Sequence, residues 1–316
     1  MSTAPATALL PVPRRTGSLA VGDGHVLAWQ EFGAPDGIPA LVLHGGPGSA
    51  MTPGLVRFFD LHRWRVIGFD QRGCGASTPL GSTAANDTAH LLQDIEALRL
   101  SLGVSRWCVV GGSWGATLAL AYAACHPQAI GALLLRGLFV PDAAELRWFF
   151  HGARDLAPTT WDDLATLAPP TCRDHLVPWL AAVFDDGEPD LQARVALAWQ
   201  SWERALEGTT APHAADLQRL IARYRIQSRY LAHRCWLGDG GLRGAARALP
   251  RVPVHFLHGA LDLVCRPAAA RALKQLVAGS RFERVPEAGH DPMHPAMVAA
   301  MQAALHALCA REGEPA

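Results

Sequence analysis

The chain has 316 residues, of which 50% are hydrophobic and 18% are charged, and 28 basic residues balance 28 acidic ones to a formal net charge of zero. A chain of this length and hydrophobicity can bury a large core, which excludes a wholly disordered protein. The lack of a basic excess argues against nucleic acid as a partner, because binding to a polyanion requires clustered positive charge.

Cysteine usage and the N-terminal sequence bear on the cellular compartment. The seven cysteines are odd in number and lack the paired spacing of a zinc site or a disulfide framework, which favours a reducing, cytoplasmic location. The first 15 residues contain no basic start followed by a long apolar run, so we expect no signal peptide. No uninterrupted apolar stretch reaches about 18 residues, so we expect no membrane span.

Short apolar runs bounded by turn residues predict the strands. Residues 18–20 and 26–31 flank Gly22-Asp23-Gly24 and are typical of an antiparallel hairpin at the edge of a sheet. Further runs alternate with segments of helical periodicity, which predicts an α/β protein with a mostly parallel sheet covered by helices on both faces. These runs are Ala40–Leu43, Val66–Phe69, Trp107–Val110, Ala132–Leu135, Val254–Leu257 and Phe282–Val285.

Residues 138–250 differ from the rest of the chain. They are rich in Trp, Arg and Ala at helical spacing, as in Leu191–Leu206 and Leu217–Leu231, and contain no convincing strand. Because this segment is too long for a single crossover, we predict a helical cap domain inserted into a core domain of residues 1–137 and 251–316. The alternative is that these helices only cover one face of the sheet.

The strongest chemical signal is Gly111-Gly112-Ser113-Trp114-Gly115, which contains the pattern G-x-S-x-G. It follows a predicted strand and precedes the helix-like stretch 116–124, which is the strand–turn–helix context of a nucleophile elbow. Glycines beside the serine permit the sharp turn, and the helix N-terminus offers the N–H of Trp114 to a developing oxyanion. The alternative is an ordinary glycine-rich turn.

A second glycine-rich loop, His44-Gly45-Gly46-Pro47-Gly48, directly follows the run Ala40–Leu43. Loops of this kind direct backbone N–H groups toward the nucleophile and complete an oxyanion hole. A phosphate-binding loop is the alternative, but Pro47 lacks an N–H and no Walker lysine follows.

The candidate acid and base follow the last two predicted strands. Asp262 comes after Val254–Leu257 and His290 after Phe282–Val285, so both lie at the sheet edge that also carries the serine. His294 is the alternative base, and His290 is preferred because the glycine before it suits a tight loop. Asp291 is the alternative acid, but an acid adjacent to the base in sequence rarely points at its Nδ1.

These residues predict acyl transfer through a serine nucleophile. His290 would take the proton of Ser113, Ser113 would attack a carbonyl, and Asp262 would orient the imidazole and stabilise the imidazolium. Water would then hydrolyse the acyl-enzyme. No clustered metal-ligand pattern is present in the sequence, so we predict neither a metal nor a cofactor.

Taken together, the motifs resemble the prolyl aminopeptidases (proline iminopeptidases), α/β hydrolases that remove N-terminal proline from peptides. The resemblance runs from about residue 18 to 305, and is carried by residues 44–48, Asp70-Gln71-Arg72-Gly73-Cys74-Gly75-Ala76-Ser77 and 111–120. It implies an α/β-hydrolase fold with a helical cap and a small peptide or aminoacyl substrate. The residues it implies are a triad of Ser113, Asp262 and His290, and the oxyanion donors Gly46 and Trp114.

The resemblance also implies that cap glutamates bind the free amine of the substrate. Trp199-Gln200-Ser201-Trp202-Glu203 resembles one such element and nominates Glu203, although its tryptophans would also serve helix packing. In the second element Gln227 stands where the family has a glutamate, and Arg229 adds an opposing charge. We therefore expect Glu203 and Gln227 to contact the substrate.

Three functions are compatible with these motifs. The first is an exopeptidase for N-terminal proline, and the second is a related hydrolase of esters, lactones or other amides. A requirement for a free amine separates these two. The third is a catalytically inactive binding protein on the same scaffold, against which the intact triad residues argue.

Overall fold

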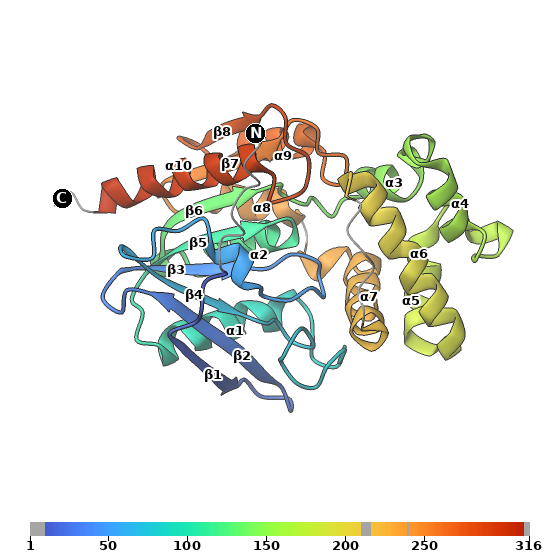
Figure 1. The fold of residues 1–316 in the computed structure, drawn as a ribbon, viewed down its shortest axis with the longest axis horizontal. Coiled ribbons are helices and arrows are strands. Elements are labelled where there is room, and N and C mark those ends of the chain that lie inside the picture. The colour runs from blue at the N-terminus through green and yellow to red at the C-terminus, as the bar shows by residue number, and fades with distance from the viewer. Residues whose placement is uncertain (1–9, 210–215, 239, 313–316) are drawn as a thin grey trace, which may run out of the picture.

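The computed structural model describes residues 10–209, 216–238 and 240–312, which form an eight-stranded sheet flanked by helices (Figure 1). The strand order is β1-β2-β4-β3-β5-β6-β7-β8; β1 and β2 are antiparallel, as are β2 and β4, and all other pairs are parallel. The predicted hairpin and the six predicted runs are confirmed. The strands are β1 (Arg15–Ala20), β2 (Val26–Gly33), β3 (Ile38–Leu43), β4 (Trp64–Phe69), β5 (Trp107–Gly112), β6 (Ile130–Arg136), β7 (Val254–Gly259) and β8 (Arg281–Val285).

The two faces of the sheet are covered by different helices. Alternate residues of a strand point to opposite faces, so Leu41 and Leu43 join one hydrophobic cluster while Ala40 and Val42 join another. The first cluster includes residues of α1 (Thr88–Ser101), α2 (Trp114–Cys125), α8 (Gly241–Arg247) and α9 (Pro267–Lys274). The second includes residues of α10 (Pro295–Glu312). Both faces are buried, which explains why the central strands are apolar throughout.

The chain between β6 and β7 forms a group of helices with its own hydrophobic cluster. This group contains α3 (Ala143–Arg147), α4 (Pro158–Ala165), α5 (Leu176–Asp186), α6 (Pro189–Glu207) and α7 (Leu217–Ala232), and no strand occurs in the described part of residues 138–250. Figure 1 shows α3 to α7 beside the end of the sheet rather than on a face of it. α8 lies apart from them and packs on α2.

Local sequence explains the two helices that matter most for the site. α6 begins with proline at its first turn and ends at Gly208, which has a left-handed φ of 69°. Val195, Trp199, Trp202 and Leu206 recur at helical spacing and are buried. Asp216 caps α7 by accepting from the N–H of Arg219 at 3.1 Å.

α7 lies directly on the loops that follow β3 and β4. A Cβ built on Gly48 would lie 2.3 Å from the carbonyl oxygen of Arg223, so only glycine permits this approach. Arg219 Nη1 donates to the carbonyl oxygen of Gly75 at 2.8 Å. These contacts bring α6 and α7 to the carboxyl ends of the strands. Within the described residues, no helix is long and apolar enough to cross a membrane.

Candidate active site

Ser113 occupies the sharp turn between β5 and α2 that the sequence predicts. Its φ is 56° and its ψ is −123°, a backbone conformation that side-chain-bearing residues rarely adopt. A Cβ on Gly111 would lie 2.2 Å from the carbonyl oxygen of Gly115, and a Cβ on Gly115 would lie 2.1 Å from that of Leu43. The glycines of G-x-S-x-G are therefore required by close backbone approach on both sides of the serine.

The loop after β3 runs beside the serine. A Cβ on Gly45 would lie 3.3 Å from Ser113 Cβ, and Gly46, with a φ of +114°, lines the same cavity as Ser113. Trp114 is the first residue of α2, and the first N–H groups of a helix have no acceptor within it. Gly46 and Trp114 thus lie in the two segments that flank Ser113, and their role as oxyanion donors stays a prediction.

One glutamine ties these two segments together. Gln71 Nε2 donates to the carbonyl oxygen of His44 at 3.0 Å, and Gln71 Oε1 accepts from the indole N–H of Trp114 at 2.9 Å. The backbone N–H of Gln71 donates to His44 Nε2 at 3.1 Å. Burial lowers the pKa of His44, so the ring is neutral and this nitrogen can accept. The loop after β4 thus holds the two segments that flank the nucleophile.

Asp262 and His290 form a buried hydrogen-bonded pair. His290 Nδ1 lies 2.8 Å from Asp262 Oδ2, while Asp262 Oδ1 accepts from the N–H groups of Val264 at 3.0 Å and Cys265 at 2.8 Å. Burial raises the pKa of Asp262, but the charge and hydrogen bond of His290, together with the other donors, bring the pKa below its ordinary value. The ionised carboxylate can therefore orient and stabilise an imidazolium.

The alternative acid and base lie elsewhere. His294 stands just before α10 and is not among the residues that line the cavity around Ser113. Asp291 lines the cavity but is exposed, and its Oδ1 accepts from the N–H of Met293 at 2.8 Å. The structure thus brings Asp262 together with His290.

Ser113 and His290 line the same cavity without a hydrogen bond between them. Ser113 Oγ lies 4.0 Å from the thiol sulfur of Cys265, whose pKa burial raises, so that neighbour is an uncharged thiol. Catalytic hydrogen bonds are often long in unliganded enzymes and shorten when substrate binds. A working triad would need the serine hydroxyl to turn from Cys265 toward His290.

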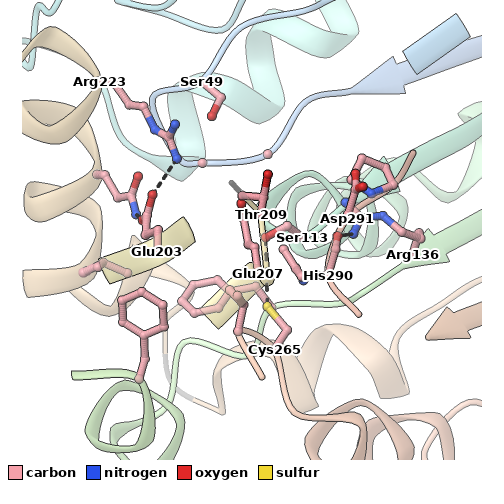
Figure 2. Close-up of a pocket in the computed structure, with 18 of the residues that line it drawn as sticks. Ser49, Ser113, Arg136, Glu203, Glu207, Thr209, Arg223, Cys265, His290 and Asp291 are labelled. Atoms are coloured by element: carbon pink, nitrogen blue, oxygen red, sulfur yellow. Dashed lines mark hydrogen bonds and ion pairs between the residues drawn. The ribbon is translucent and has the colours of Figure 1, made fainter. Parts of the chain in front are cut away.

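The cavity around Ser113 has a volume of about 270 Å³, near the lower end of ligand pockets, which span roughly 300–1,000 Å³. The strands with their loops and the segment between β6 and β7 both contribute to it (Figure 2). The strands and loops outside that segment contribute Gly45, Gly46, Ser49, Ser113, Arg136, Cys265 and His290, and the segment between β6 and β7 contributes Phe139, Leu146, Phe149, Phe150, Glu203, Glu207, Arg223, Gln227 and Leu231. Such a cavity can hold a small acyl group against the serine.

Glu203 and Gln227 both line this cavity, but Glu203 already has partners. Its Oε2 accepts from Arg223 Nη2 at 2.8 Å and from the hydroxyl of Tyr224 at 2.9 Å, and its Oε1 accepts from Gln227 Nε2 at 2.6 Å. The sequence suggested that Arg229 brings a positive charge to the amine-binding element that contains Gln227. Arg229 instead faces Asp185, at 3.9 Å, and Arg223 supplies the cation beside Glu203.

Glu203→Gln is expected to lower the free energy of unfolding by about 1–3 kcal/mol, because it leaves the Arg223 guanidinium without its anion. The Arg223 side chain is 31% exposed, which keeps the loss below that of a fully buried pair. Urea-induced unfolding at neutral pH measures the change. Glu188→Gln, at the exposed start of the same helix, is the control. A Glu203→Gln variant as stable as this control would show that the ion pair does not stabilise the fold.

Three charged residues of the cavity were not foreseen from the sequence. Arg136, at the end of β6, is buried and donates to the carbonyl oxygen of His290 at 2.6 Å, which holds the histidine loop. Arg223 neutralises Glu203. Glu207 lies one helical turn after Glu203, and burial raises its pKa, an effect that attraction to His290 opposes and repulsion from Glu203 reinforces. The i, i+4 spacing of the two glutamates was the available signal for Glu207.

The described residues contain no group of three or more His, Cys, Asp or Glu side chains arranged to hold a metal ion. What the site does offer is a serine at a strained turn, a buried acid–histidine pair and two candidate N–H donors around one small cavity. This arrangement is suited to acyl transfer from an ester or amide.

Comparison with known proteins places this arrangement in a family. A profile described as the alpha/beta hydrolase fold matches residues 39–295. A proline iminopeptidase from Xylella fastidiosa (strain 9a5c) is 35% identical over 301 residues, covering 92% of this chain and 95% of the relative. A proline iminopeptidase from Xanthomonas citri is 37% identical over 299 residues, with coverage of 92% and 95%.

A similar solved structure is the proline iminopeptidase of Mycobacterium smegmatis. It superposes with a TM-score of 0.63 at 21% identity, covering 94% of this chain and 100% of that one. At this identity the likeness shows the fold alone. It agrees with the α/β-hydrolase architecture that the sequence motifs imply.

Proposed function

This chain belongs to the proline iminopeptidase family of α/β hydrolases, and we propose that it is a serine exopeptidase that releases proline from the N-terminus of peptides. The observation that carries the proposal is the shared cavity. Ser113, the hydrogen-bonded pair of Asp262 and His290, and the carboxylates of α6 all line or border one small space between the sheet and α7.

In the proposed mechanism, His290 takes the hydroxyl proton of Ser113 while Oγ attacks the carbonyl carbon of the N-terminal residue. The N–H groups of Gly46 and Trp114 bind the oxyanion of the tetrahedral intermediate. Asp262 stabilises the imidazolium. The intermediate collapses as the peptide C–N bond breaks, and His290 gives the proton to the departing amine. Water, activated by the same histidine, then hydrolyses the acyl-enzyme and regenerates the serine.

The cavity also supports selection of a single N-terminal residue. Leu146, Phe149 and Phe150 provide apolar surface for a pyrrolidine ring. Glu203 and Gln227 form the polar wall that faces the amine in this proposal. A polypeptide continuing beyond the amine would have to pass through this wall, so an interior residue of a peptide would not fit.

The proposal extends to organisation and location. We assign residues 138–250 to a cap domain and residues 1–137 and 251–316 to the core domain, with α8 as the part of the cap segment that packs on the core. The partner is a small peptide or aminoacyl compound, and neither nucleic acid nor membrane is required. The scattered cysteines support a cytoplasmic location.

A panel of substrates tests the proposal. The wild-type chain is expected to cleave a prolyl arylamide and to lose about 100-fold or more in kcat/KM on its N-acetylprolyl counterpart. The acetyl group removes the ammonium charge and adds volume beside the polar wall formed by Glu203 and Gln227. Comparable cleavage of both compounds, or activity on simple esters alone, would favour a related ester or amide hydrolase. This second function is tested because Arg223 already pairs with Glu203, so this carboxylate attracts a substrate amine less strongly.

A further inference from the structure

A second cavity adjoins the cavity around Ser113. It has a volume of about 420 Å³, and Gly45, Ser49, Arg136 and Arg223 line both spaces. Gly45 stands next to the nucleophile, since a Cβ built on it would lie 3.3 Å from Ser113 Cβ. A substrate whose acyl part fills the first cavity therefore has the second cavity beside its scissile bond.

The charged side chains that line the second cavity all carry the same sign. Arg136, Arg219 and Arg223 contribute guanidinium groups, and none of the described residues in its wall is Asp or Glu. Ser49 and Thr52 add hydroxyl groups. The first cavity, in contrast, is lined by carboxylates as well as by arginines. A wall of guanidinium and hydroxyl groups attracts an anion that accepts hydrogen bonds, and a peptide with a free C-terminus carries such an anion, its carboxylate.

Arg136 differs from the other two arginines because it lacks a carboxylate partner. Arg223 pairs with Glu203 at 2.8 Å. Arg219 pairs with Asp216 at 3.2 Å. Arg136 is only 6% exposed, and it forms no ion pair within the part of the chain that the structure describes. The positive charge without a counterion is therefore the most deeply buried of the three.

Acidic groups of the triad region act on Arg136, but none of them forms an ion pair with it. Burial lowers the pKa of its guanidinium, and the charges of Asp262, Glu207 and Asp291 offset this effect only in part. Asp262 is already occupied, since its Oδ2 lies 2.8 Å from His290 Nδ1. A buried guanidinium without a close carboxylate is costly, and an anionic ligand in the second cavity would reduce that cost.

Arg136 lies on the side of the site from which the leaving group departs. In the proposed mechanism His290 protonates the departing amine, and Arg136 Nη1 donates to the carbonyl oxygen of this histidine at 2.6 Å. Figure 2 draws Arg136 beside His290, with Glu203 and Arg223 across the view. The amine end of a short substrate, which faces Glu203 in the proposed function, and its leaving end therefore lie at opposite ends of the site.

The distance from the nucleophile to Arg136 limits the length of the leaving group. A Cβ on Gly112 would lie 2.5 Å from Arg136 Nη2, so this nitrogen lies within about 4 Å of the Gly112 Cα. The next Cα, that of Ser113, is about 3.8 Å further along the chain, which puts Arg136 Nη2 within roughly 8 Å of it. An extended residue spans at most about 3.6 Å, so one or two residues cover this distance.

We infer that the second cavity is the leaving-group site, and that Arg136 binds the free C-terminal carboxylate of a leaving group one or two residues long. This inference rests on the proposed exopeptidase function and names its substrate class, which is dipeptides and tripeptides that begin with proline rather than long chains. Arg219 and Arg223 keep their own partners and add positive potential along the cavity.

The test compares substrates that differ only at the C-terminus. Hydrolysis of Pro-Gly and Pro-Gly-Gly is measured beside that of Pro-Gly-NH₂ and Pro-Gly-Gly-NH₂, with a prolyl arylamide as the reference for the chemical steps. In the wild-type chain kcat/KM for each free acid should exceed that of its amide about 10- to 100-fold, as expected for a charge-assisted hydrogen bond to a buried partner. For proline followed by six glycines the acid and the amide should differ less than about twofold, because that carboxylate lies beyond Arg136.

Variants separate binding of the carboxylate from support of the His290 loop. Arg136→Gln removes the charge but keeps N–H groups that can donate to the carbonyl oxygen of His290, and its acid-to-amide ratio should fall to about 1. Arg136→Lys keeps the charge and should retain part of the ratio. Arg194→Gln, on the exposed side of α6 and outside both cavities, is the control and should keep the wild-type ratio. A purely structural role of Arg136 would lower all rates together and leave the ratio unchanged.

Calorimetric binding of glycylglycine and of glycylglycinamide repeats the comparison without turnover, and the free acid should bind at least tenfold more tightly. If the wild-type chain cleaves the prolyl arylamide but treats acids and amides alike, the inference is overturned and the proposed function stands. If it cleaves no prolyl compound but prefers glycylglycine in a manner that depends on Arg136, the carboxylate site is supported and the proposed function fails. Equal binding of the two probes, or a preference for Pro-Asp-NH₂ over Pro-Gly, would also overturn the inference. Thermal unfolding checks that each variant is folded, and the wild-type ratio decides the matter if the Arg136 variants are not.

Discussion

Ser113→Ala is expected to lower kcat for a prolyl arylamide by about a million-fold, as removal of the nucleophile does in serine proteases. The substitution deletes only Oγ, and alanine retains the Cβ that serine already accommodates at a φ of 56°. The fold and the cavity should therefore be preserved. Steady-state kinetics on purified protein measures the loss, and thermal unfolding shows whether the variant is folded.

Cys265→Ala is the matched comparison for this variant, because the Cys265 sulfur lies 4.0 Å from Ser113 Oγ. Burial raises the pKa of this thiol, so a thiolate nucleophile is not expected there. Its loss of activity should be far smaller than that of Ser113→Ala. Activity retained in Ser113→Ala and abolished in Cys265→Ala would assign the nucleophile to the cysteine.

His290→Ala is expected to reduce kcat by a similar factor, about a million-fold, because the hydroxyl of Ser113 is a poor nucleophile without a base. The substitution also removes the hydrogen-bond donor of Asp262 Oδ2, while Oδ1 still accepts from the N–H groups of Val264 and Cys265. Thermal unfolding is therefore recorded in parallel. His290→Gln, which can still donate to Asp262, serves as the second variant if the alanine variant is unstable.

His294→Ala is the comparison for the base. His294 stands four residues further on, just before α10, and does not line the cavity. Its removal should leave kcat close to that of the wild type. A severe loss in His294→Ala with a mild one in His290→Ala would reverse the assignment of the base.

Much of the fold was predictable because it depends on local patterns. The predicted runs at 40–43 and 107–110 lie inside β3 and β5, where residues on both strand faces join hydrophobic clusters. The turn at Ser113 was predictable for a similar reason. Gly111 and Gly115 leave no room for a Cβ, so the pattern itself encodes the close approach of the backbone.

The charges of the cavity were not predictable in this way. Arg223 and Gln227 lie one turn apart on α7, and Arg229 lies on another face of the helix, but periodicity alone does not tell which face meets α6. The sequence therefore suggested that Arg229 is the cation beside the amine-binding element that contains Gln227. The packing of α6 on α7 instead brings Arg223 to Glu203 and leaves Arg229 facing Asp185.

Sequence by itself sufficed for the strands, for the elbow at Ser113 and for the positions of Asp262 and His290 after β7 and β8, because backbone sterics and hydrophobic periodicity involve near neighbours in the chain. The pairing of Glu203 with Arg223 and the position of Glu207 in the cavity emerged only in three dimensions. Both depend on the packing of α6 against α7 and on the loops that these helices contact. This packing decides which charged side chains lie close enough to form an ion pair.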